Sequence, residues 1–157
     1  MPNPTNEELN VATWKIPNAL GIIGSSANNE FNGMTASWIT QVSMEPLLIA
    51  VGIDNKSITH GLMSASEYFS LNLFSENYTK VFVKFSKPAE YKEGFLNEEP
   101  ITLTENNMPI FDNAIVWFEM RKKTHMILEP TPFISVKLLI AKLLKLKKEL
   151  HTWEIQE

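Results

Sequence analysis

Short apolar runs separated by turn residues dominate the first 120 residues, and this pattern constrains the fold more than any other feature. Such runs occupy residues 19–25, 47–53, 68–74 and 114–120. Runs of this length, bounded by glycine, proline, asparagine or serine, are typical of strands. Residues 34–42 are expected to form the return strand of a hairpin whose turn ends at Asn32-Gly33. The chain is therefore predicted to be mainly β, a barrel or sandwich with one or two short helices.

The two helices are expected between the strands. Ser57 or Thr59 suits the N-cap of a helix that runs to Ser66. Ser75 suits the N-cap of a second helix, in which apolar residues recur at weak helical spacing up to Phe85. Residues 87–113 are predicted to be irregular because prolines and a glycine interrupt them repeatedly.

Motifs of several common enzyme classes are missing. The chain has no cysteine, which excludes disulfides, thiolate metal sites and a catalytic thiol. Its histidines, His60, His125 and His151, lie far apart without the spacing of metal ligands. The sequence has no Gly-x-Ser-x-Gly elbow and no phosphate-binding P-loop. It also lacks alternating strand–helix units and a Gly-x-Gly-x-x-Gly turn, so a Rossmann nicotinamide site is disfavoured.

Length and charge make several further classes of protein unexpected. The 157 residues have the size of one domain. A formal net charge of −4 makes nucleic-acid binding unexpected. No apolar stretch reaches the roughly 18 residues of a membrane span, and residues 1–10 lack the basic and apolar segments of a signal peptide. We therefore expect a cytoplasmic protein.

Four short segments follow one another in an order that is typical of one family. They are Asn32-Gly33-Met34-Thr35-Ala36-Ser37-Trp38, residues 41–51 (QVSMEPLLIAV), residues 55–60 (NKSITH) and Phe69-Ser70-Leu71-Asn72-Leu73. Each is weak alone, but the ordered set resembles the flavin reductase-like family of FMN-binding split β-barrels over residues 14–120. Trp38 and Leu47 depart from that pattern, in which a smaller residue and a second proline are usual.

The resemblance implies a flavin site. A flavin ring is a flat plate with polar edges, and backbone groups along a strand can bond to it if the side chains are small. Small side chains at positions 35–37 would allow that approach, and a bulky residue at Ala36 is expected to fill the space of the ring. Donors and a cation at residues 55–59 would hold the phosphate. The cofactor-binding residues that the resemblance implies are Asn32, Met34, Thr35, Ala36, Ser37, Trp38, Asn55, Lys56, Ser57, Thr59, Phe85 and Lys87.

The implied activity is the reduction of FMN, with FAD as an alternative, by NADH or NADPH. Electrons would pass to free flavin, an oxygenase partner, iron or another acceptor. Hydride transfer between stacked rings requires positioning rather than a side-chain acid or base, so no catalytic residue is expected. The family also implies a homodimer. Two alternatives stay open: an FMN-containing electron-transfer protein without nicotinamide activity, and a non-catalytic barrel used for binding or assembly.

The C-terminal segment departs from the family pattern. We therefore expect a flavin reductase-like domain over residues 1–125 and an atypical tail over residues 126–157. Leu139, Leu143, Leu146 and Leu150 follow helical spacing with lysines between them, which predicts a basic amphipathic helix. Such a helix could pack on its own domain, a partner or a membrane surface. Codons compatible with residues 126–133, read one base earlier, can also encode a turn resembling the family's, which suggests a shifted reading frame. The DNA sequence of the gene tests this, and no family-like reading in the other frame would refute it.

Overall fold

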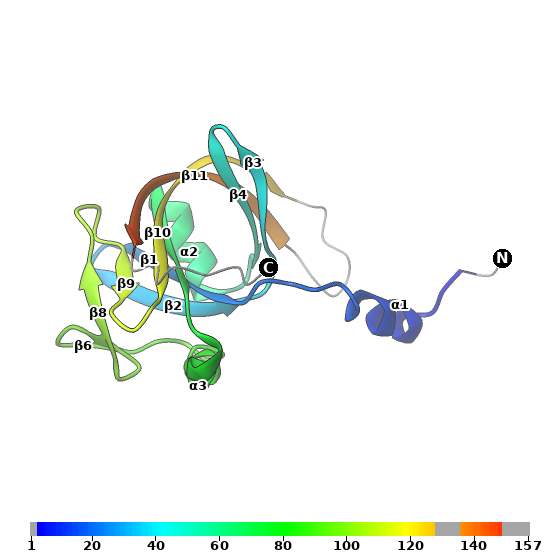
Figure 1. The fold of residues 1–157 in the computed structure, drawn as a ribbon, viewed down its shortest axis with the longest axis horizontal. Helices are drawn as coiled ribbons and strands as arrows, with labels where there is room; N and C mark the ends of the chain where they lie inside the picture. The colour runs from blue at the N-terminus through cyan, green and yellow to red at the C-terminus, as the bar shows by residue number, and fades with distance from the viewer. Residues whose placement is uncertain (1–2, 128–135, 149–157) are drawn as a thin grey trace, which may run out of the picture.

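The computed structural model describes residues 3–127 and 136–148, and for residues 124–127 and 136–148 the description is confined to the backbone. The described chain is mainly β, in two antiparallel sheets (Figure 1). The first sheet has the order β2-β1-β5-β10-β11-β4-β3 and the second the order β6-β7-β8-β9. The strands are β1 Gly21–Ala27, β2 Glu30–Ala36, β3 Ile39–Met44, β4 Leu47–Asp54, β5 Tyr68–Leu73, β6 Tyr91–Lys92, β7 Phe95–Leu96, β8 Glu99–Leu103, β9 Pro109–Phe111, β10 Val116–Ile127 and β11 Val136–Lys148.

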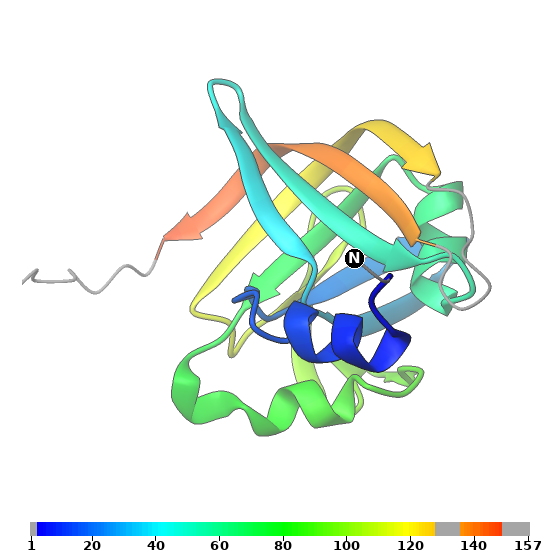
Figure 2. The same cartoon turned by 90° about the vertical axis from the view of Figure 1, so that its right-hand side faces the viewer.

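The large sheet is strongly curled. Its two edge strands, β2 and β3, are consecutive in the chain and are joined only by Ser37 and Trp38. So short a link spans on the order of 10 Å, so the two edges must lie close together. The amide of Gly52 in β4 donates to the carbonyl of Trp38 at 2.8 Å. Figure 2 shows the curl. The single strand expected over 34–42 is therefore wrong, because the chain changes sheet edge at Ser37.

The first hairpin turns earlier than expected. Asn28 and Asn29 both have positive φ, 54° and 64°, which suits the two-residue turns that connect twisted strands. Gly33 lies inside β2 instead, opposite Gly24. A Cβ on Gly33 would lie 2.8 Å from the ring of Phe85. The Asn-Gly pair is therefore explained by close packing rather than by a turn.

Two apolar clusters lie on the two faces of β1 and β2. The first contains Ile23, Ala36, Ile49, Val51, Ile53, Met63, Phe69, Leu71 and Met120. The second contains Ile22, Val81, Phe85, Leu96, Ile101, Phe111 and Ala114. Helix α2 (Ile58–Ala65) buries Thr59, Leu62 and Met63, and it contacts β1 and β2. The second expected helix is a 3₁₀ turn, Glu76–Tyr78, followed by α3 (Lys80–Lys84), which buries Val81.

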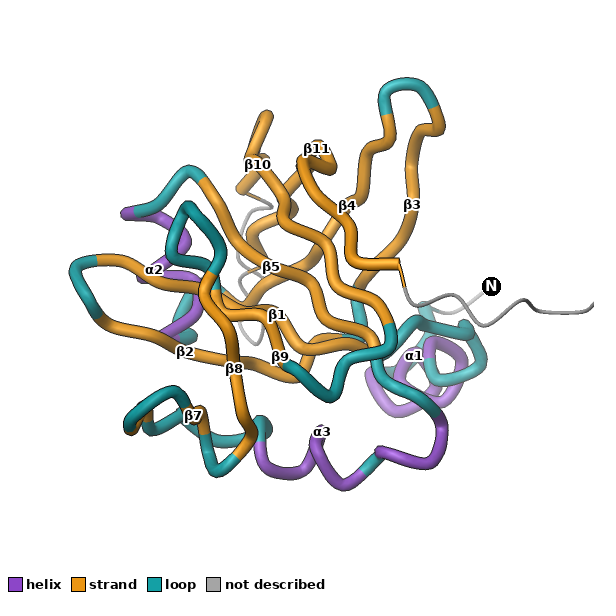
Figure 3. The backbone as a smooth tube through the Cα atoms, turned by 60° about the vertical axis from the view of Figure 1, so that its left-hand side comes forward, coloured by secondary structure: helices purple, strands orange, loops and turns teal. Residues whose placement is uncertain are grey.

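The C-terminal run forms a strand, so the expected helix is wrong. Strand β11 lies between β10 and β4, and it pairs with both (Figure 3). Hydrogen-bond partners on two sides outweigh the helical spacing of the leucines, since local propensity yields to tertiary pairing. Residues 128–135 and 149–157 of the expected tail lie outside the described residues. The shifted reading frame stays a prediction.

A helix that the sequence reading missed, α1 (Asn6–Thr13), precedes the sheet. Thr5 and Glu8 form a reciprocal capping box at its start. None of its residues is buried, and Trp14 just beyond it is 88% exposed. Figure 1 shows α1 beside the sheet rather than across it. None of the described helices has the length and hydropathy that crossing a membrane requires.

Candidate functional site

The predicted site has two halves, residues 32–38 and residues 55–59, and they lie together where the edges of the large sheet meet. A buried side-chain bond joins them: Asn32 Nδ2 of β2 donates to Thr59 Oγ1 of α2 at 2.7 Å. This bond ties the start of α2 to β2. The bond from Gly52 to Trp38 joins the end of the first half to β4, which leads into the second. Residues 32–38 and 55–59, which are separated by 16 residues in the chain, therefore form one region.

Asn32 links three segments. Its side chain is buried, and its Oδ1 accepts from the amide of Ala89 at 2.9 Å, while its Nδ2 reaches Thr59. Thr59 is fully buried. Both residues therefore hold the region together from within, and neither presents its side chain to solvent.

Thr35 faces the chain that follows α3. Its amide donates to the carbonyl of Phe85 at 3.0 Å, and its Oγ1 donates to the carbonyl of Phe82 at 2.7 Å. Phe85 itself is buried, with its ring edge-on to that of Phe111 at 5.0 Å between centroids. Phe85 therefore belongs to the core. The hydroxyl of Thr35 is already used for holding the 82–85 segment.

The remaining residues of β2 divide between core and surface. Ala36 is only 6% exposed and packs in the first apolar cluster, which Met34 borders. A larger side chain at Ala36 would therefore meet core side chains, and the expectation that it would fill the space of a flavin ring stays a prediction. Ser37 is exposed, and Trp38 is 48% exposed. Of positions 34–38, these last two present side chains at the edge junction.

The loop between β4 and α2 is held by local hydrogen bonds. Ser57 caps α2: its Oγ accepts from the amide of His60 at 3.1 Å and donates to the carbonyl of Asp54 at 2.7 Å. Asp54 Oδ1 accepts from the amide of Lys56 at 2.9 Å. Asn55 and Lys56 are exposed. The Ser57 hydroxyl is engaged, so the exposed cation of Lys56 and the amides at the start of α2 are the donors that an anion would meet here.

A buried carboxylate supports the segment on which Thr35 rests. Glu99 in β8 is only 5% exposed, and it accepts from Lys84 Nζ of α3 and from the hydroxyl of Tyr78, each at 2.7 Å. Burial acts to raise the pKa of Glu99, but the hydrogen bonds from Lys84 and Tyr78 outweigh it and lower that pKa. The network fixes α3 against β8, and thereby fixes the carbonyls that Thr35 contacts.

Comparison with known proteins identifies the family. The flavin reductase like domain matches residues 13–145. This chain belongs to the flavin reductase-like domain family. The match includes most of β11, so it continues past the boundary that the sequence alone places at residue 125.

Individual relatives of this flavin reductase-like domain are distant. A stachydrine N-demethylase reductase subunit from Rhizobium meliloti is 32% identical over 87 residues, which cover 55% of this chain and 36% of that protein. The solved structure of an NADH:FAD oxidoreductase from Streptomyces globisporus is 16% identical with a TM-score of 0.78, covering 94% of this chain and 86% of that one. A flavin reductase structure from Haemophilus somnus is 16% identical in sequence with a TM-score of 0.80, covering 92% of this chain and 89% of that one.

The curated relatives differ from this chain in length, whereas the solved structures share its fold. The first curated relatives are longer proteins, and the matched part of this chain spans 20% to 36% of their length. The structural matches, at such low identity, establish that the flavin reductase-like domain has the same fold as these proteins.

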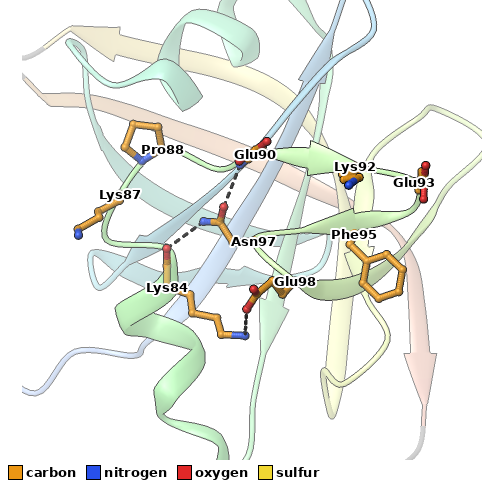
Figure 4. Close-up of a pocket in the computed structure, with 9 residues that line it drawn as sticks. All are labelled: Lys84, Lys87, Pro88, Glu90, Lys92, Glu93, Phe95, Asn97 and Glu98. Carbon is orange, nitrogen blue, oxygen red and sulfur yellow. Dashed lines mark hydrogen bonds and ion pairs between the residues drawn. The ribbon is translucent and has the colours of Figure 1, made fainter.

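The sequence reading missed a groove of about 670 Å³ beside α3. The segment that follows α3 and the β6–β7 hairpin form it (Figure 4). Its lining is Lys84, Lys87, Pro88, Glu90, Lys92, Glu93, Phe95, Asn97 and Glu98. Only Lys87 was among the expected site residues of this flavin reductase-like domain. The lining residues lie between 84 and 98. The expectation that residues 87–113 are irregular is wrong, because they include strands β6 to β9, and their sequence pattern gave no signal of a site.

Proposed function

We propose that this chain reduces flavin with NADH or NADPH and holds FMN, or FAD, where the two sheet edges meet. The observation that carries the proposal is the junction itself, with exposed Ser37 and Trp38 on one side and exposed Lys56 at the start of α2 on the other. Family membership supports flavin as the ligand. The proposed barrel is of the split type, and the proposed location is the cytoplasm.

The residues at the junction fit a flavin mononucleotide. Backbone groups at Ser37 and Trp38 would bond the polar edge of the ring, and the exposed indole would shield the ring from water. Lys56 and the first amides of α2 would hold the phosphate. Bound flavin supplies the hydride acceptance. The chain supplies orientation, because two stacked rings react when they are held in place.

Two measurements test the proposed function. Purified protein should show the visible absorption of bound flavin, and a protein without it would be a binding or assembly barrel instead. Anaerobic mixing of the flavin-loaded protein with NADH and with NADPH should bleach that absorption. Retained absorption with both nucleotides would contradict reductase activity and favour an electron-transfer protein. The electron acceptor, whether free flavin, an oxygenase partner or iron, is then found by adding each to the reduced protein.

Lys56 is expected to bind the FMN phosphate. Lys56→Gln should weaken FMN binding about 10- to 100-fold, since one hydrogen bond to a charged group contributes about 1.5–3 kcal/mol. Titration of flavin-free protein with FMN, followed by fluorescence, measures this. Lys80→Gln, which removes an exposed lysine on α3, is the matched control and should change the affinity little. Equal affinities for both variants would refute the phosphate assignment.

We also propose a homodimer. The β3–β4 hairpin projects from the body (Figure 2), and it carries Val42 and Met44, which are 50% and 81% exposed. Apolar side chains on a projecting edge strand favour pairing with another chain. Sedimentation should show a dimer, and Met44→Glu should shift it toward monomer. A wild-type monomer with full flavin occupancy would contradict the proposal.

A further inference from the structure

The groove beside α3 combines an aromatic ring, two cations and a carboxylate that are free of partners in the described part of the chain. Phe95 is 46% exposed. Lys87 and Lys92 are exposed, and neither forms an ion pair with the residues described. Glu93, at the tip of the β6–β7 hairpin, likewise has no ion pair there. By contrast, Lys84 Nζ forms an ion pair with Glu99 Oε1 at 2.7 Å.

These groups follow a definite order along the groove. Figure 4 shows Lys87 next to Pro88 at one end, with its amine pointing away from the hairpin, and Lys92, Glu93 and Phe95 at the other end. The first end lies near β2, because the carbonyl of Phe85, two residues before Lys87, accepts from the amide of Thr35 at 3.0 Å. Thr35 is two residues before Ser37, where the edge junction begins. The groove therefore leads away from the proposed flavin site, and its far end is aromatic.

Hydrogen bonds join the walls of the groove. Asn97 Nδ2 donates to the carbonyl of Lys84 at 3.0 Å, and Asn97 Oδ1 accepts from the amide of Glu90 at 2.9 Å. This side chain thereby joins the end of α3 to the strands of the hairpin. Asn32 holds the same segment at Ala89. A groove held together in this way loses less conformational entropy when a ligand binds.

We propose that this groove binds the adenosine diphosphate portion of a nicotinamide dinucleotide, and that Glu93 favours NADH over NADPH. The inference rests on the proposed function, since the nicotinamide must reach the flavin at the junction. Phe95 provides a face on which a base can stack. Lys92, at the same end of the groove as Phe95, attracts the diphosphate. A carboxylate accepts hydrogen bonds from the ribose hydroxyls of NADH and repels the additional phosphate of NADPH.

The first experiment measures binding of ADP to the wild-type protein by calorimetry, both with and without FMN. We expect Phe95→Ala to weaken ADP binding about five- to tenfold, and Lys92→Gln to weaken it about tenfold. Lys80→Gln, outside the groove, is the control. The affinity for FMN should stay the same in the Phe95 and Lys92 single variants. ADP that does not bind, or binds equally to all variants, overturns the inference.

The second experiment tests the nucleotide preference. With saturating FMN, the wild type should have a lower KM for NADH than for NADPH, and ADP should compete with NADH. Glu93→Gln should shift the KM ratio toward NADPH about tenfold, with little change in kcat. An unchanged ratio overturns the role of Glu93.

The two proposals fail in different ways. A protein that binds no flavin refutes the proposed function, whereas ADP binding in the groove is still measured on that protein. A protein that binds FMN and oxidises NADH, but whose Phe95 and lysine variants behave as wild type, refutes only the groove. Circular dichroism of each variant establishes that it is folded.

Discussion

Asn32→Ala is expected to lower the free energy of unfolding by about 2–4 kcal/mol, because it leaves a buried hydroxyl and a partly buried amide without their partner. The hydroxyl of Thr59 loses its donor at 2.7 Å, and the amide of Ala89 loses its acceptor at 2.9 Å. Flavin occupancy should also fall, since the start of α2 is no longer tied to β2. Urea unfolding measures the stability, and visible absorption per folded subunit measures the occupancy.

A double-mutant cycle isolates the bond between Asn32 and Thr59. Thr59→Val keeps the shape of the side chain and removes its hydroxyl. The coupling between the two substitutions should be about 1 kcal/mol or more, as for neighbours in one network. Additive effects would mean that the bond contributes nothing to stability, and would contradict the role given to Asn32 in joining the two halves of the site.

Gly24→Ala should destabilise the protein by about 3 kcal/mol or more, because the new methyl group has no space. A Cβ at this position would clash with Ser70 Oγ and lie 2.5 Å from the carbonyl oxygen of Pro109. The same two groups share a buried hydrogen bond, which the methyl group would disturb. The expected fall in Tm is on the order of 10 °C for a chain of this size.

The matched control is the same substitution in helix α2. A Cβ on Gly61 would meet no atom within 4 Å. Gly61→Ala should therefore stabilise the protein by up to about 1 kcal/mol, because alanine has the higher helix propensity. Thermal unfolding of both variants under the same conditions gives the comparison. A Gly24→Ala protein as stable as the wild type would show that β1, β5 and β9 do not pack as described.

The sequence motifs predicted which segments form the candidate site, but not which way each side chain points. The segment 32–38 and the loop 55–59 were expected at one site, and the structure brings them together through the hydrogen bond between Asn32 and Thr59. Individual side chains could not be assigned in the same way. Thr35, Ala36 and Phe85 all belong to the motif region, yet their side chains face a neighbouring segment or the core. Which way a residue in an edge strand points depends on where the sheet curls.

Local pattern alone determined the mainly β composition, strands β1, β4 and β5, a helix that begins at Ser57 or Thr59, and membership of the family. These features depend on apolar runs, turn residues and short motifs, which are local properties. Only the tertiary structure decided that β2 ends at Ala36, that Gly33 packs under Phe85, and that residues 136–148 form a strand. Each of these depends on partners distant in the chain: the opposite sheet edge, an aromatic ring after α3, and two strands with unpaired edges. Such contacts override local preference because a buried backbone group without a partner costs more than an unfavourable propensity.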